Sequence, residues 1–187
     1  MKPAKLVIAS SIVLSIVASL GTAAHAQSAS NAGKTASTSA ATISKDDADR
    51  LVGIAQANIA EIETGKLALQ KSRNPDVKAF AQMMIDDHTK GLAETKKVAA
   101  AKKVTLPSET DIGHQKLAAE LKALPADQFD EGFAKRAGVA GHANVLASLK
   151  KDMSAVEDAD VKALAAKLEP TVAHHLAMAK KLADSVK

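Results

Sequence analysis

Apolar residues recur along most of this chain at the three- and four-residue spacing of an amphipathic α-helix. From about residue 44 onward the sequence is rich in Ala, Leu, Lys and Glu, and no window shows the alternation of a β-strand. The pattern predicts helices over residues 45–72, 75–103, 111–123, 127–154 and 158–185. Four long helices and one short one favour an all-α, four-helix bundle with a short extra connecting helix.

Helix-ending residues separate the predicted segments. Ser44 is placed to cap the first helix, and Asn74-Pro75-Asp76 ends that helix and starts the second. Pro125 ends the third predicted helix before the fourth begins. Pro170 falls inside the last predicted helix, which we therefore expect to be kinked or split.

Three histidines lie near the middle of the apolar stripes of three different predicted helices. At about 100° per residue, His88, His142 and His175 each share a face with Val, Leu, Met or Ala residues of their own helix. The first helix has no histidine, but Glu61 lies toward the edge of its inner face. With about 1.5 Å of rise per residue, all four side chains fall near the middle of the bundle. The sequence therefore predicts that one carboxylate and three imidazoles meet in the core.

These four side chains have the chemistry of a metal site. Neutral imidazoles and a carboxylate are ligands for Zn, Cu, Ni or Fe, so Glu61, His88, His142 and His175 would suit one transition-metal ion. A cation would also compensate the buried carboxylate, which is costly without a partner. The alternative is a cluster of core histidines that are held by hydrogen bonds and bind no metal. The pattern leaves both interpretations open.

Two neighbours of these histidines are placed less clearly. Asp87 precedes His88 and lies about 100° away from it around the helix. It would either orient a neighbouring imidazole, as carboxylates near metal ligands do, or lie in solvent as Asp86 should. His174 is displaced by the same angle from the stripe of His175, and we expect it near the surface.

The first 26 residues have the three parts of a cleaved signal peptide. Lys2 and Lys5 form a basic start, residues 6–20 form an apolar run, and Ala24-His25-Ala26 is a small-residue cleavage site. We expect cleavage before Gln27, a flexible Ser/Ala/Thr-rich linker over 27–43 and a bundle domain over 44–187. No later segment approaches the roughly 20 apolar residues of a membrane span. These features predict a periplasmic protein with no membrane span in its mature form.

Composition excludes several classes of function. The chain of 187 residues has no Cys, which rules out disulfides and thiolate sites. Its net charge of +4 falls to +2 when Lys2 and Lys5 are removed, because 23 basic residues then face 21 acidic ones. The chain also has no Trp or Tyr to stack on bases. We therefore expect no nucleic-acid partner.

Several short motifs resemble, in order and spacing, those of a bacterial domain-of-unknown-function family. The motifs are Glu61 to Ala68, Val77 to Ala81, Asp87-His88, Phe129-Asp130, His142, and Pro170 with His175-Leu176. They span roughly residues 45–185. That family is periplasmic and ferritin-like, and its members are often labelled outer membrane proteins. The resemblance implies a ferritin-like four-helix bundle and export, and it implies no established activity.

A ferritin-like bundle suggests a di-iron site, but the residues argue against one. Such sites use Glu-x-x-His on two helices, whereas Ile85, Val139 and Val172 stand three residues before the histidines. Without a nucleophile–base pair or a Gly-rich phosphate loop, an enzyme is the weakest hypothesis. The stronger two are a module that binds one transition-metal ion, with a stress or envelope role, and a structural module that binds an envelope protein partner. The sequence sets neither the partner nor the oligomeric state.

Overall fold

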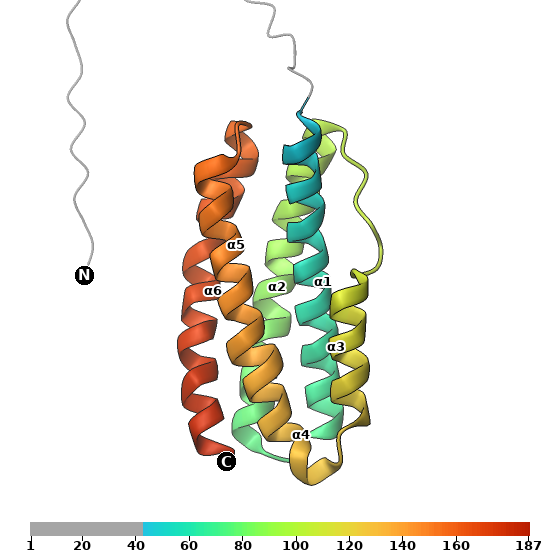
Figure 1. The fold of residues 1–187 in the computed structure, drawn as a ribbon, viewed down its shortest axis with the longest axis vertical. Coiled ribbons are helices and arrows are strands. Elements are labelled where there is room, and N and C mark those ends of the chain that lie inside the picture. The colour runs from blue at the N-terminus through green and yellow to red at the C-terminus, as the bar shows by residue number, and fades with distance from the viewer. Residues whose placement is uncertain (1–42) are drawn as a thin grey trace, which may run out of the picture. The chain divides into compact units, whose positions relative to one another are not determined.

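The computed structural model describes residues 43–187. The predicted signal peptide and nearly all of the predicted linker lie outside these residues, so the proposed boundaries at 26 and 43 stay predictions. The described part of the chain is all-helical (Figure 1), in the order α1 Lys45–Lys71, α2 Pro75–Lys102, α3 Ile112–Ala123, α4 Ala126–Gly132, the π-helical segment η1 Phe133–Gly141, α5 His142–Ala155 and α6 Ala159–Ser185.

The long helices form the predicted four-helix bundle. The α1 helix packs along α2, α5 packs along α6, and α2 packs along α6, while the short α3 lies against α1 (Figure 1). The all-α class with one short connecting helix is therefore confirmed. None of the described helices is long and apolar enough to cross a membrane.

The helix boundaries follow from capping residues that the sequence identifies. The Ser44 hydroxyl accepts a hydrogen bond from the Asp47 amide at 3.0 Å and caps α1. The Asn74 side chain accepts from the Asp76 amide at 2.8 Å and caps α2, with Pro75 in the first turn. These caps use donors that the first turn of a helix leaves free, so the hairpin between α1 and α2 forms where predicted.

The predicted continuous α-helix over 127–154 is wrong in its middle. The segment is helical throughout, but Phe133–Gly141 forms a π-helix between α4 and α5. A π-helical turn is wider than an α-helical one and is often found at functional sites. Close packing accompanies it, because a Cβ at Gly138 would stand 3.0 Å from the Cβ of Ala179.

Of the two outcomes expected at Pro170, a kink or a split, the split is wrong, because α6 runs as one helix from Ala159 to Ser185. Proline removes one backbone hydrogen bond and presses on the carbonyl four residues earlier, at Ala166. Both Pro170 and Ala166 are exposed, so water can satisfy that carbonyl. Leu164 and Val172 are buried on either side and hold both halves of the helix to the core.

Two apolar clusters fill the core, and a polar layer separates them. The Phe133 cluster includes Ala68, Phe80, Met84, Phe129, Phe133 and Ala179. The Leu51 cluster includes Leu51, Ile54, Ala99, Leu149, Val161 and Val172. Five of the buried polar residues between them along the helices are called the polar layer: Asn58, Glu61, His88, His142 and His175.

Candidate metal centre

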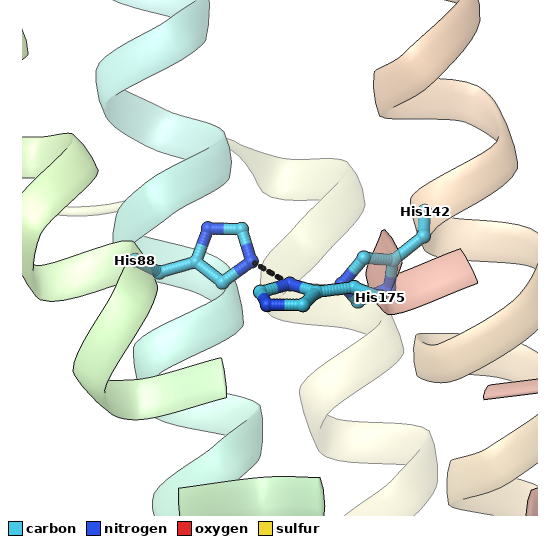
Figure 2. A group of neighbouring side chains, drawn as sticks. All are labelled: His88, His142 and His175. Atoms are coloured by element: carbon cyan, nitrogen blue, oxygen red, sulfur yellow. Dashed lines mark hydrogen bonds between the residues drawn. The ribbon is translucent and has the colours of Figure 1, made fainter. Parts of the chain in front are cut away.

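The structure brings the three predicted histidines together from three helices. One ring nitrogen of each of His88, His142 and His175 lies within 4.8 Å of the other two. The ring centroids are 5.2–5.7 Å apart, and His142 and His175 are fully buried. Figure 2 shows the three rings gathered at one point, with a hydrogen-bond contact drawn between His88 and His175. The chemistry of this point depends on which nitrogens carry protons.

Asn58 determines the proton position on His88. Its amide nitrogen donates to the Ile54 carbonyl at 2.8 Å, so its oxygen must face His88. That oxygen lies 3.1 Å from His88 Nδ1 and can only accept, so Nδ1 carries the proton and Nε2 has a free lone pair. Gly91 makes room for this contact, because a Cβ there would stand 2.5 Å from the Asn58 oxygen.

Asp87 determines the proton position on His175. Its carboxylate lies 3.1 Å from His175 Nε2, which therefore donates, and Nδ1 keeps a free lone pair. Burial raises the pKa of Asp87, but hydrogen bonds from Lys90 and His175 outweigh it and hold that pKa below its usual value. Asp87 thus orients a histidine from another helix, which was one of its two predicted roles.

The π-helix determines the proton position on His142. Its Nδ1 lies 2.9 Å from the Gly138 carbonyl and 3.1 Å from the Ala137 carbonyl, so Nδ1 is the donor. The remaining nitrogen, Nε2, is buried and has no hydrogen-bond partner. An unpaired buried nitrogen is uncommon in a folded core and calls for an explanation.

A neutral cluster therefore contains lone pairs that face each other. His175 Nδ1 and His88 Nε2 lie 3.3 Å apart, and in these tautomers neither can donate to the other. A proton or a metal ion between them would turn this repulsion into attraction. In a tetrahedral site with metal–nitrogen bonds of about 2.0–2.1 Å, two ligand nitrogens are about 3.3–3.4 Å apart. The spacing of this pair fits two ligands of one metal ion, and the third ligand nitrogen of the group lies within 4.8 Å of both.

Burial disfavours the proton as the solution. Burial and the neighbouring imidazoles lower the pKa of His88 to about 3. Burial is also the main cause that lowers the pKa of His142 to about 4. The pKa of His175 is lowered by burial, although its hydrogen bond to Asp87 opposes the shift. All three imidazoles are thus neutral near pH 7, which is the form that binds metals.

Glu61 lies beside the cluster but outside the group of three. Its Oε1 is 4.0 Å from His142 Nδ1, the nitrogen that faces the π-helix carbonyls. Its Oε2 is buried without a hydrogen-bond partner, and burial raises its pKa to about 8. The group of adjacent ligand atoms among the described residues holds the three histidines alone. Glu61 as a fourth ligand stays a prediction.

Some residues of this site were not identified from sequence. Asn58 is one of them, although a buried amide four residues after Ile54 can bond that carbonyl and present its oxygen. The carbonyls of Ala137 and Gly138 have no sequence signal beyond nearby glycines, because the π-helix creates their direction.

Comparison with known proteins agrees with this architecture. A crystal structure of a DUF305 fragment from Deinococcus radiodurans is similar with a TM-score of 0.67 and 13% identity, covering 76% of this chain and 98% of that one. CopM in the Cu(II)-bound form is similar with a TM-score of 0.63 and 18% identity, covering 75% and 97%. At these identities the likeness shows a shared fold alone.

Sequence comparison identifies the family. No curated protein sequence matches the chain. A family model described as a domain of unknown function, DUF4142, matches residues 32–182. The predicted membership of a domain-of-unknown-function family is thus confirmed, and the chain belongs to the DUF4142 family.

Proposed function

We propose that this protein binds one transition-metal ion through His88 Nε2, His142 Nε2 and His175 Nδ1. The observation that carries the proposal is the pattern of hydrogen bonds around the cluster. Each histidine directs one nitrogen to an acceptor: Asn58, the Asp87 carboxylate, or the carbonyls of η1. Such partners fix the tautomer of metal-binding histidines. The opposite nitrogens are left as three lone pairs in a buried site.

The donor set narrows the choice of ion. Imidazole suits Zn, Cu, Ni and Fe, and three protein ligands leave a further position for water or another ligand. CopM, which shares the fold, was solved with Cu(II) bound, so Cu(II) and Zn(II) are the first ions to test. Glu61 is the proposed fourth ligand, because its Oε1 lies 4.0 Å from the His142 ring and its buried Oε2 has no hydrogen-bond partner.

Metal loading of the full chain tests the proposal. Untagged protein, saturated with Cu(II), Zn(II) or Ni(II) and freed of excess, is expected to retain one ion per chain by elemental analysis. Substituting His88, His142 or His175 by Leu should weaken binding by at least about 100-fold, because each removes one of three ligands. His174→Leu is the matched control, since His174 is adjacent to His175 and exposed. Loss of metal binding in the Glu61→Gln variant would support Glu61 as the fourth ligand.

The alternative function is a structural module of the cell envelope. It predicts that His88→Leu folds with little loss and leaves the metal content unchanged. Sub-stoichiometric metal under every loading condition would contradict a metal-binding function and favour this alternative. Circular dichroism of each variant separates loss of a ligand from loss of folding.

We also propose that the protein acts in the periplasm after cleavage before Gln27. The basic start, the apolar run and the Ala24-His25-Ala26 site support export. Mass spectrometry of protein recovered from the periplasmic fraction should find a chain that starts at Gln27. An intact chain confined to the cytoplasm would contradict export.

A further inference from the structure

A cleft runs between α1 and α5, the two neighbouring long helices of the bundle that pack least closely against each other. The other neighbouring long helices pack along each other, but α1 and α5 approach closely at few points. The gap holds a cavity of about 600 Å³, within the range of about 300–1,000 Å³ found for small-molecule sites. From this cleft we propose a binding site for a small organic amine, with an apolar body and one protonated nitrogen.

Small residues keep the cleft open. Gly53 and Ala57 face it from α1, and Gly141 and Ser148 face it from the opposite wall. A Cβ at Gly53 would meet no atom within 4 Å, so the space beside it is empty rather than filled by a neighbour. A Cβ at Gly141 would stand 3.4 Å from Glu61 Oε1, so its absence leaves the approach to that carboxyl clear.

The walls of the cleft favour an apolar molecule. Ile54, Leu149, Leu168 and Val172 line it, and they belong to the Leu51 cluster or pack against it. A ligand that covers them gains the free energy of removing apolar surface from water. The inner end of the cleft is polar, because Glu61 and His88 of the polar layer line it there.

Glu61 is the charged residue of this lining that lacks a partner in the described part of the chain. The others are paired: Arg50 with Asp152, Asp111 with His114, Asp87 with Lys90, and Arg136 with Glu120. Glu61 is 5% exposed, its Oε2 has no hydrogen bond, and His142 Nδ1 is 4.0 Å from its Oε1. A buried carboxyl without a partner is costly, so a ligand that donates a hydrogen bond to Glu61 would be stabilised at this point.

An ammonium group is a better partner for the Glu61 carboxyl than a hydroxyl or a carboxylate group. It has three N–H donors and no acceptor, so it can bond the Glu61 oxygens, and its charge compensates a carboxylate. A hydroxyl would supply one donor and no charge, and a carboxylate would be repelled. Because the amine contacts Glu61 and the apolar walls, its binding does not require a metal ion at the histidines. The test below therefore uses metal-free protein, and its outcome is independent of the proposed function.

Three probes of equal length separate the contributions. Metal-free full-length protein is titrated at pH 9, where Glu61, with a pKa of about 8, is a carboxylate and an alkylamine, like the lysine side chain, is still protonated. The probes are hexylamine, hexanol and hexanoate, and binding is measured by calorimetry and by NMR shifts of cleft residues. Hexylamine is expected to bind about tenfold or more tightly than hexanol, as a charge-assisted hydrogen bond implies, and hexanoate most weakly. Glu61→Gln should remove the preference for the amine and leave hexanol binding unchanged.

Two further variants keep the test decisive. Glu63→Gln is the matched control, because Glu63 is exposed on the same helix and should leave all three affinities unchanged. Ala57→Phe fills the cleft from its α1 wall and should weaken all three probes together. Hexylamine that binds no more tightly than hexanol, or that binds Glu61→Gln or Ala57→Phe as it binds the natural chain, would overturn the proposal.

Discussion

The Phe133 cluster and the polar layer are equally buried parts of one bundle, but they differ in whether their side chains need hydrogen-bond partners. Phe129 and Phe133 are fully buried and stack at a centroid distance of 5.9 Å, so burial alone satisfies them. His142 and His175 are just as buried, but each needs a partner for both ring nitrogens. The outer nitrogens have partners and the inner ones face each other. Burial completes the first region, whereas a bound ion would complete the second.

A drop in pH should lower the free energy of unfolding more than any single substitution described below, because it acts on the histidines of the polar layer. Below about pH 6.5 the imidazoles of the unfolded chain take up protons, whereas His88 and His142 in the folded chain keep pKa values of about 3 and 4. The free energy of unfolding of metal-free protein should therefore fall as the pH drops from about 6.5 to 4. Urea unfolding across this range checks the slope, which the double variant His88→Leu/His142→Leu should largely lose.

Glu61 has the opposite dependence on pH. Its pKa of about 8 in the folded chain exceeds the ordinary value of 4.5, so between these values the folded chain holds a proton that the unfolded chain does not. Its contribution to stability is lost as the pH rises toward 8. Metal-free protein should thus be most stable near pH 6.5, and Glu61→Gln should flatten the decline above it. An unchanged decline in this variant would contradict the assignment.

Phe133→Ala should give the largest loss of stability among the substitutions. Removing a fully buried aromatic side chain and leaving a cavity costs about 3–5 kcal/mol. Urea unfolding measures the loss, and metal binding by the folded fraction should be unchanged. A loss below about 1 kcal/mol would mean that the Phe133 cluster does not stabilise the bundle in the way its burial implies.

Asp87→Ala should weaken metal binding while the fold is retained. Loss of the carboxylate that holds His175 Nε2–H frees the imidazole to rotate, and such changes cost about 10–100-fold in metal affinity. Competition with a chelator measures the affinity. Asp86→Ala is the matched control, because Asp86 is exposed and bonds Gln82. Equal affinities for the two variants would contradict the role of Asp87.

Gly53→Ala should have the smallest effect and the opposite sign. A Cβ at Gly53 meets nothing within 4 Å, so the substitution should stabilise α1 by about 0.5–1 kcal/mol. Gly138→Ala is the contrasting control, because its Cβ would press on Ala179 at 3.0 Å and should destabilise the packed side. Thermal unfolding distinguishes the two, and equal shifts would mean that the cleft is not open.

The sequence predicts much of this molecule because its signals are local. Apolar spacing and capping residues determine the helices, and the central position of each histidine on its stripe determines that they meet. The π-helix could not be predicted, because nothing in the sequence beyond nearby glycines marks the segment whose carbonyls bond His142. The cleft was missed because Gly53, Ala57 and Ser148 are small residues that line it, and small residues give no periodic pattern that would reveal an empty space beside them.

X-ray absorption spectroscopy of the full chain loaded with one equivalent of Zn(II) tests the three-histidine centre most directly. Three imidazole ligands should give a nitrogen shell at about 2.0–2.1 Å with the multiple scattering of three rings. His142→Leu should reduce that scattering to two rings, and His174→Leu should leave it at three. A shell of oxygen alone, or a spectrum that His142→Leu does not change, would contradict metal binding at this cluster.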